Sequence, residues 1–352
     1  MSTSQLEGER TVQFDKHLYN EQVNQLCQPA IQQFDQIIKT TVLFHAVFLG
    51  IALAECVLFV LFATFLSGSS ILAFSVALLF LTSFSYLTLR LYFQAKQPEQ
   101  LIVLRDHYIH ACKQLLNYQE SIPEHHIALA NALRKLAAQL HEREYHCYKA
   151  PPSLVTLGPS IEKFGCWWHW RDVHKMKEAL LLCAIDEHIK LVKCEPTNLE
   201  VHAALANAYV MLSSLYIDPR KGDGHEEDKW IPPQRYSQEM LEKFRATAER
   251  AIEEFTILND YAPEDPWVHA QLAYSYHDLQ MPQEEIREYE TILRLCPEDK
   301  ESLFKLGMLY FQQGLNAKGL QVYEELKRTH YKKSESLIRF YGEYAPLHPF
   351  AD

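Results

Sequence analysis

The chain has 352 residues, 45 acidic and 34 basic side chains, and a formal net charge of −11. That charge excludes a broadly basic nucleic-acid binder. The scarcity of glycine (11) and proline (16), with 12% aromatic residues, excludes a fibrous chain and wholesale disorder. Between Lys39 and Arg90 the only formal charge is Glu55, whereas the remainder has the composition of an ordinary soluble protein. The sequence therefore predicts that the apolar region contacts lipid and that the remainder contacts water.

The N-terminal segment, residues 1–40, begins with ten polar residues and continues with an apolar pattern. The spacing of three, four and five residues predicts an amphipathic helix that is interrupted near Pro29. Such a helix could lie on the membrane surface or pack on the soluble domain, and the sequence leaves both open. The apolar residues are Val12, Phe14, Leu18, Val23, Leu26, Ile31, Phe34 and Ile38.

Residues 41–90 contain two apolar runs, 41–66 and 71–89, separated by four small residues. A helix rises about 1.5 Å per residue, so each run can cross a hydrocarbon core of about 30 Å. A turn this short makes the two helices antiparallel neighbours and leaves both flanks on one side. We expect a transmembrane helical hairpin, with a buried core pair as the alternative interpretation.

Basic residues close to the runs predict the orientation of this hairpin. Lys39 precedes the first run, Arg90, Lys96 and Arg105 follow the second, and the turn carries none. The positive-inside rule then makes both termini cytoplasmic. We expect an integral membrane protein with two spans in a bacterial inner membrane.

Glu55 lies near the middle of the first run, where a lone carboxylate is costly by a few kcal/mol. It should be protonated or paired. It could serve as an ion or proton site or hold an oligomer together, or it could be a neutral carboxyl bonded to Ser75, Thr82 or Ser83 of the neighbouring helix.

A helical pattern recurs four times after the apolar region, in 126–136, 202–212, 269–279 and 303–313. In each copy a small residue follows a leucine, and an apolar or tyrosyl residue comes three positions later. The last two copies are 34 residues apart, as shown by Pro263 and Pro297, Leu272 and Leu306, Tyr276 and Tyr310, and Tyr289 and Tyr323. The small residues are Ala130, Ala206, Ala273 and Gly307.

This pattern resembles the tetratricopeptide repeat, in which Leu-[Gly/Ala]-x-x-Tyr lies on helix A and a proline closes the unit. The resemblance implies an all-α fold: a two-helix hairpin followed by an α-solenoid of about four helix pairs over 91–330. We expect a capping helix and tail in 331–352. The segment 97–119 should form a further helix that caps the stack or continues from the second span.

The first two units carry long inserts in this interpretation. In the first, helix A should cover about 124–145, the insert about 146–172, and helix B about 173–194. In the second, 67 residues separate Pro196 from Pro263, and the excess falls in a turn-rich stretch from Asp218 to Pro233. We expect that insert to be an exposed loop, with Gly222 to Gly224 as a solvated turn.

Catalytic spacing is absent from the sequence: it contains no Gly-rich phosphate loop, HExxH, GxSxG or kinase-like set. We expect no enzyme, no cofactor and no small-molecule substrate. The eight cysteines should be reduced thiols. His146-Cys147 with Cys166 and His169 could hold zinc, but their spacing matches no familiar finger, and aromatic packing of the neighbouring tryptophans 167, 168 and 170 is the alternative. The recurrent His126, His202 and His269 occupy a helix-packing position rather than a metal row.

In the tetratricopeptide family, helix A lines a groove that receives a peptide. Ile127 and Ala203 stand where the family's carboxylate-binding subset has lysines, so no carboxylate clamp is predicted. The resemblance implies these partner-binding residues: Asn131, Arg134, Asn207, Met211, Trp267, Tyr274, His277, Phe304, Met308 and Phe311.

The pattern as a whole predicts a membrane-anchored scaffold that binds a protein or peptide and contacts membrane lipid but no nucleic acid. One alternative is an oligomeric membrane protein in which Glu55 acts as a polar or proton site. Another is a secreted host-membrane interaction protein of bacterial origin, because residues 41–90 resemble the bilobed hydrophobic region of chlamydial inclusion-membrane proteins.

Overall fold

The computed structural model describes residues 16–65, 70–148, 156–221 and 230–342. Within these ranges the chain forms helices and turns and no strand, so the all-α prediction is confirmed. The chain divides into two compact units, which are described separately: unit 1 comprises Met1–Glu187 with Glu227–Pro232, and unit 2 comprises His188–Glu226 with Pro233–Asp352.

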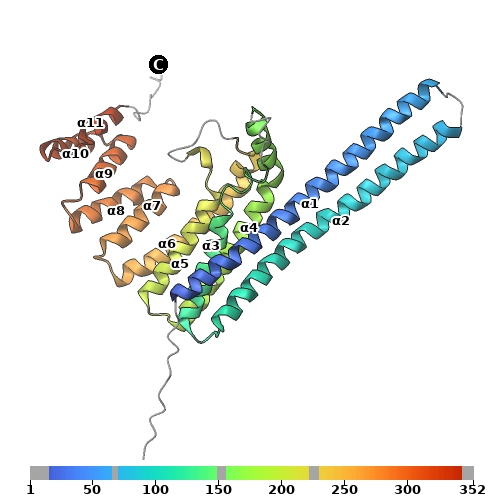
Figure 1. The fold of residues 1–352 in the computed structure, drawn as a ribbon. Coiled ribbons are helices and arrows are strands. Elements are labelled where there is room, and N and C mark those ends of the chain that lie inside the picture. The colour runs from blue at the N-terminus through green and yellow to red at the C-terminus, as the bar shows by residue number, and fades with distance from the viewer. Residues whose placement is uncertain (1–15, 66–69, 149–155, 222–229, 343–352) are drawn as a thin grey trace, which may run out of the picture. The chain divides into compact units, whose positions relative to one another are not determined.

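Unit 1 begins with two long antiparallel helices, α1 (Lys16–Phe65) and α2 (Ser70–Leu116), which pack side by side (Figure 1). The predicted interruption near Pro29 is wrong, because α1 continues through Pro29 and α2 continues likewise through Pro98. Both prolines are exposed. The lost backbone hydrogen bond therefore falls on the outer side of the helix, while burial on the other side holds it together.

The N-terminal part of α1 packs on the protein, which decides between the two alternatives for residues 16–40. Tyr19, Val23, Phe34 and Ile38 are buried, in a unit where α1 contacts α2 and α3 (Pro123–Gln139). Leu18 is 52% exposed and does not belong to the buried face. Val12 and Phe14 lie outside the described residues.

The other half of the same two helices has the opposite character. Leu49 is 72% exposed and Phe80 is 73% exposed, and most of the large apolar side chains around them are exposed as well. The most apolar 18-residue windows of the two helices have mean hydropathies of 2.3 and 1.9, and neither window has a buried residue. By length and composition, both helices could cross a membrane.

The helix after α3 is longer than the sequence predicts. α4 runs from Gly158 to Cys194, so much of the expected insert over 146–172 is helical, and α3 ends at Gln139 rather than near 145. Trp170 is buried on α4 with Tyr145 and Cys166. The aromatic run is therefore part of a helix, in which Trp170 is buried and Trp167 is exposed. Burial of the apolar side chains on one side stabilises helix where an insert was expected.

The second insert is also more ordered than predicted. Tyr145 donates a hydrogen bond to the backbone carbonyl of Trp230 (2.9 Å), and the indole of Trp230 packs on the cluster of Tyr145, Cys166 and Trp170. The prediction of a wholly exposed loop is wrong at this point. The predicted turn at Gly222 to Gly224 lies outside the described residues.

Unit 2 is a succession of helix pairs in which each helix contacts the next. In the last two pairs the A helices begin at Pro266 and Lys300 and the B helices at Pro282 and Asn316, both 34 residues apart, as predicted. This is a tetratricopeptide-like organisation. The helices are α5 (Leu199–Tyr216), α6 (Gln238–Tyr261), α7 (Pro266–Asp278), α8 (Pro282–Leu295), α9 (Lys300–Gln312) and α10 (Asn316–Arg328), with short 3-10 turns η2 (Pro219–Lys221) and η3 (Pro233–Tyr236) between α5 and α6.

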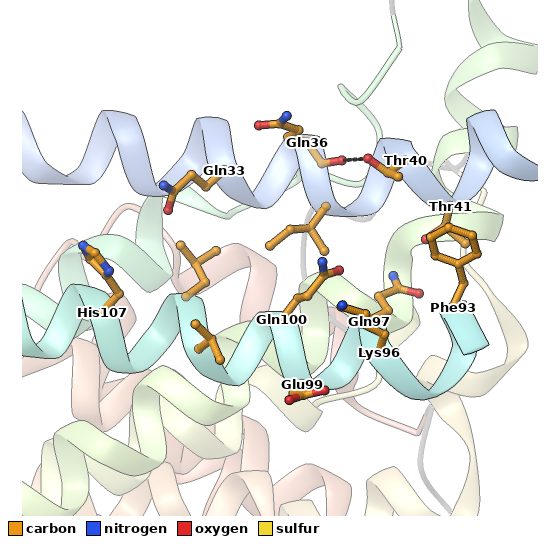
Figure 2. Close-up of a pocket in the computed structure, with 13 residues that line it drawn as sticks. Gln33, Gln36, Thr40, Thr41, Phe93, Lys96, Gln97, Glu99, Gln100 and His107 are labelled. Atoms are coloured by element: carbon orange, nitrogen blue, oxygen red, sulfur yellow. Dashed lines mark hydrogen bonds between the residues drawn. The ribbon is translucent and has the colours of Figure 1, made fainter. Parts of the chain in front are cut away.

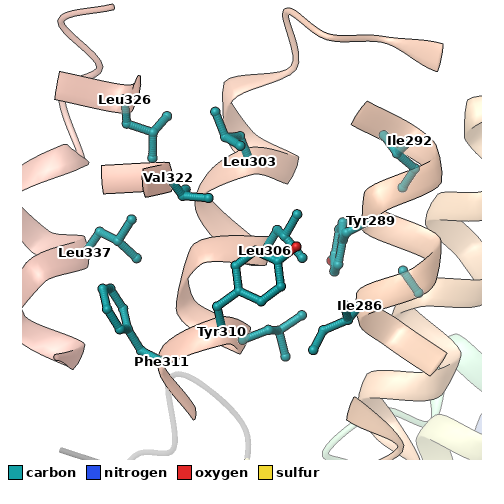
Figure 3. Close-up of a cluster of buried hydrophobic side chains, with 12 residues drawn as sticks. Ile286, Tyr289, Ile292, Leu303, Leu306, Tyr310, Phe311, Val322, Leu326 and Leu337 are labelled. Carbon is teal, nitrogen blue, oxygen red and sulfur yellow. The ribbon is translucent and has the colours of Figure 1, made fainter. Parts of the chain in front are cut away.

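The last pair is closed by a short cap, α11 (Ser334–Leu337) followed by η4 (Ile338–Phe340). Leu337 is fully buried in the cluster shared by α8, α9 and α10 (Figure 3). A Cβ on Gly307 would lie 2.8 Å from Leu337 Cδ2 and 2.8 Å from Val322 Cγ1. Glycine therefore replaces the alanine of the other repeats because the cap fills that space.

Candidate partner-binding surface

Four predicted partner-binding residues of α7 and α9, together with Lys305, make up what we term the helix-A surface: Trp267, Tyr274, Phe304 and Met308, with Lys305. Trp267 and Tyr274 are 44% and 47% exposed. Lys305 Nζ donates a hydrogen bond to Tyr274 Oη (3.0 Å) and lies 4.6 Å from the centre of the ring. Phe304 and Met308 are half-buried against the core cluster. Apolar, aromatic and cationic groups are thus available on two consecutive A helices.

Phe311 does not belong to this surface. It is buried, and a Cβ added to Gly319 would lie 2.5 Å from its ring, so Phe311 fills the contact between α9 and α10. The sequence prediction placed Phe311 in the groove because the repeat pattern alone does not distinguish an aromatic residue that faces the groove from one that packs against helix B.

His277 lies at a different place, in a cavity of about 410 Å³ lined by the ends of α5, η3, α6 and α7. Its Nδ1 is 3.1 Å from Glu285 Oε1, and this hydrogen bond raises the pKa of His277. Asn207 and Met211 lie half-buried on α5.

Asn131 and Arg134 lie on α3 and therefore in unit 1. Asn131 is exposed and Arg134 is half-buried. Their relation to the helix-A surface of unit 2 stays a prediction from the resemblance.

The sequence prediction missed Lys305. It follows Phe304 directly, so the repeat alignment already carried it on helix A. Its contact with Tyr274, 31 residues earlier, depends on the lateral packing of α7 and α9, which the alignment alone does not show.

The three recurrent histidines share one arrangement, which we term the histidine clamp. In each case Nδ1 faces a glutamate of the following helix B and Nε2 faces the backbone carbonyl six residues upstream. The imidazolium form donates to both acceptors and ties the loop before helix A to helix B. The glutamate and carbonyl distances are 2.7 and 3.0 Å for His126 (Glu187, Glu120), 2.8 and 3.1 Å for His202 (Glu254, Pro196), and 2.6 and 3.0 Å for His269 (Glu288, Pro263).

The fourth repeat replaces the clamp by an apolar pair. Thirty-four residues after His269 and Glu288 stand Leu303 and Val322, and both are buried in the same cluster (Figure 3). The clamp is therefore a packing element, as the sequence predicted for the histidine position. The fourth repeat also shows that a leucine and a valine can replace the histidine and the glutamate.

Glu55 faces α2 within the hairpin. Thr82 Oγ1 donates a hydrogen bond to Glu55 Oε1 (2.7 Å), which is one of the partners that the sequence suggested. Oε2 is buried and has no hydrogen-bond partner among the described residues. Ser75 instead donates to the Leu72 carbonyl.

Two of the four residues considered for zinc, Cys147 and His169, have side-chain hydrogen-bond partners in the protein. Cys147 donates to the Arg143 carbonyl (3.2 Å), and His169 Nε2 is 2.8 Å from Tyr148 Oη. Burial lowers the pKa of His169 to about 4. Among the described residues no group of three or more metal-ligating side chains converges.

A cavity of about 500 Å³ lies between α1 and α2 (Figure 2). Glutamines from both helices line it: Gln33 and Gln36 on α1, and Gln97 and Gln100 on α2. Their amides offer donors and acceptors but no net charge, so the cavity has no preference for an anion or a cation from these four groups.

The chain was compared with known protein families, curated proteins and solved structures. No protein-family model matches the chain, and no curated protein matches it. A solved structure described as the TPR2AB-domain:pHSP90-complex of yeast Sti1 is similar over 71% of this chain and 93% of that chain, with 14% identity and a TM-score of 0.24. The tetratricopeptide-like organisation therefore rests on the helix pairs and their 34-residue spacing.

Proposed function

We propose that the chain is a membrane-anchored helical-repeat adaptor that binds a protein or peptide on its helix-A surface at the cytoplasmic side. The observation that carries the anchor is the contrast within single continuous helices. α1 and α2 pack on protein over one half of their length, and over the other half their most apolar windows have no buried residue. An exposed apolar surface of this extent in a soluble protein would promote aggregation, whereas hydrocarbon covers it at no cost.

The length of the exposed half fits a bilayer. Residues 41–65 of α1 span about 37 Å at 1.5 Å per residue, against a hydrocarbon core of about 30 Å. Residues 70–90 of α2 span about 31 Å on the same basis. Lys39, Arg90 and Lys96 flank these segments, which supports cytoplasmic termini and, for a bacterial protein, insertion in the inner membrane.

The helix-A surface favours a peptide that carries an acidic group beside an apolar side chain. An ammonium group has three donors. One hydrogen bond of Lys305 goes to Tyr274, and Glu301 Oε1 lies 3.8 Å from the same nitrogen, which is longer than a hydrogen bond. A carboxylate of the peptide would therefore compete with the exposed Glu301 for the other two donors. Trp267 and Tyr274 provide rigid, half-exposed rings that can cover an apolar side chain.

A site-specific photo-crosslinking experiment tests this function. A photoreactive residue at Tyr274 or Met308 of the full-length, membrane-inserted chain should give one discrete crosslinked partner. The same residue at Arg287 or Glu324, exposed positions on helices B, is the matched control and should give none. Equal crosslinking at all four positions would contradict binding on the helix-A surface.

Anchoring is tested separately by carbonate extraction of membranes that contain the intact chain. The chain should stay in the pellet, and a variant lacking residues 41–90 should move to the supernatant. Recovery of the intact chain in the supernatant would contradict the anchor without bearing on partner binding.

A second candidate function is favoured by the buried, unpartnered Oε2 of Glu55. An oligomer in which a neighbouring hairpin donates to this oxygen would remove the cost of leaving it unsatisfied in hydrocarbon. Crosslinking of the inserted chain should then show oligomers that Glu55→Leu abolishes.

A further inference from the structure

A second cavity of unit 1, of about 300 Å³, lies where α1, α2 and α4 meet. Its lining includes Arg90 at the end of the second apolar run and Arg171 on α4. Both are exposed, and neither has a hydrogen bond or ion pair with any described residue. Two guanidinium groups thus line one small cavity with all their donors available.

The wall of this cavity is aromatic. His45 Nδ1 lies 3.1 Å from Tyr86 Oη, and the rings of His45 and Trp168 meet edge to face with their centres 5.2 Å apart. His45 lies four residues after the start of the first apolar run at Thr41, and Tyr86 lies four residues before Arg90. If the hairpin crosses the bilayer, this level is the headgroup region, where tryptophan and tyrosine are enriched.

The charge of the cavity is positive. Asp172 is the carboxylate among the described lining residues, and Gln97 Nε2 donates a hydrogen bond to it (2.7 Å). Burial raises the pKa of Asp172, and the positive charge of Arg171 opposes that effect. One carboxylate, already hydrogen-bonded, faces two free guanidinium groups, so the cavity favours an anion over a zwitterion.

We propose that this cavity binds the phosphate of an anionic phospholipid headgroup from the cytoplasmic leaflet. The proposal rests on the membrane hairpin of the proposed function but not on partner binding. A water molecule takes about 30 Å³ of liquid, so a 300 Å³ cavity has room for a phosphate with its glycerol. The arginines bind the phosphate oxygens through paired N–H donors, and Trp168 and Tyr86 contact the glycerol and the first carbons of the chains.

Lipid retention by the full-length chain tests this site. The protein is reconstituted in nanodiscs of phosphatidylcholine with a minority of phosphatidylglycerol, released into mild detergent, and analysed by native mass spectrometry for bound lipid. Wild-type protein should retain phosphatidylglycerol in preference to phosphatidylcholine. Arg90→Gln/Arg171→Gln should lose about 30-fold in retention, because each basic group near an anionic headgroup contributes about fivefold.

Lys332→Gln/Lys333→Gln is the matched control. It removes the same charge from exposed residues that neither line the cavity nor flank the apolar segments, and it should retain phosphatidylglycerol like the wild type. If Arg90→Gln/Arg171→Gln does not insert, Arg90→Lys/Arg171→Lys decides, with an intermediate loss because lysine keeps the charge without the paired donors.

Three results would overturn the proposal. These are equal retention by wild type and the arginine variants, equal loss in the lysine control, and displacement of the lipid by soluble glycerol phosphate at low concentration, which would identify a free phosphate ester as the ligand. Because only membrane-inserted protein is analysed, failure of the anchor would be seen first in the carbonate extraction and would be distinguished from failure of this site.

Discussion

The histidine clamp of the third repeat can be exchanged for the apolar pair of the fourth repeat, and this exchange is a quantitative test of what the clamp contributes. His269 and Glu288 are 7% and 19% exposed at their side chains and are joined by a 2.6 Å contact. The chain itself supplies the substitutes, since Leu303 and Val322 occupy the same repeat positions. We therefore compare His269→Leu, Glu288→Val and the double variant.

The two single variants should be destabilising for different reasons. His269→Leu removes both hydrogen bonds of the ring and leaves a largely buried carboxylate without its donor, which should cost about 2–3 kcal/mol. Glu288→Val should cost about 1–2 kcal/mol, because a neutral His269 still donates to the Pro263 carbonyl. The double variant leaves no buried charge, so it should lie within about 1 kcal/mol of the wild type.

Amide hydrogen exchange of α7 and α8 in the full-length chain measures these costs locally. His269→Leu should speed exchange of the protected amides about 30- to 150-fold, since each 1.4 kcal/mol is tenfold. The double variant should restore exchange to within about fivefold of wild type. Additive effects, with the double variant as unstable as the sum of the singles, would refute the exchange of clamp for apolar pair.

Three further predictions concern other parts of the molecule. The pKa of His202 is raised, because its hydrogen bonds to Glu254 and a backbone carbonyl outweigh the lowering effect of burial. A raised pKa contributes stability at low pH, and this stability is lost as the pH rises through that pKa, so the amides of α5 and α6 should exchange faster above neutral pH after correction for the intrinsic exchange rate. Protection that does not change with pH would contradict this prediction. Gly319→Ala should destabilise α9 and α10 by about 1–3 kcal/mol, because its Cβ would lie 2.5 Å from the Phe311 ring, and an unchanged melting temperature would show that the ring moves freely. Glu55→Gln keeps an oxygen acceptor for its threonine partner and should leave carbonate-resistant insertion unchanged, whereas loss of insertion would show that the carboxyl itself is required.

Repeats with a strict period could be predicted from the sequence down to their helix starts. The 34-residue spacing of Pro263 and Pro297 and of Tyr289 and Tyr323 predicted pairs whose first helical residues, Pro266 and Lys300, are separated by the same number. The period, the small residue and the tyrosine agree on helix A of both repeats, so local propensity and packing favour one answer there. The pattern departs at Glu285, which stands at the small-residue position of helix B, and at Tyr331, which stands where a proline would close the last repeat.

The unbroken courses of α1 and α2 could not be predicted in the same way. Proline lowers helix propensity by about 3 kcal/mol wherever it occurs in the interior, and the sequence does not show which side of the helix will be buried. Pro29 is exposed between buried Cys27 and Ala30, and the packing of those neighbours outweighs the local penalty. The start of α4 was missed for a related reason, since its tryptophans are compatible with loop or helix until their contacts are known.

The residues of the candidate surface were predicted in part, and the errors of that prediction have one origin. Residues on helix A alternate between outer and inner sides, and the resemblance alone assigns a side only where the repeat is regular. Tyr274 and Met308 fall on the accessible side, whereas Phe311 is turned inward because Gly319 leaves a space that only a ring fills. Lys305 depends on contact between two helices that are distant in the sequence.

The continuity of the two long helices has a mechanical consequence for unit 1. α1 and α2 pass from their apolar halves into the packed half without a loop, and α1, α2 and α3 are tied together there by the hydrogen bonds from Tyr108 to Ala132 and from Lys135 to Asn20. A bend between the apolar half and the packed half would have to break helical hydrogen bonds in both α1 and α2 at once. If the apolar halves cross a bilayer, unit 1 is therefore held at a fixed tilt and height above it. Under that condition, Arg90 on α2 and Arg171 on α4 are kept at the headgroup level by the helices themselves, so the cavity needs no flexible segment to reach its lipid.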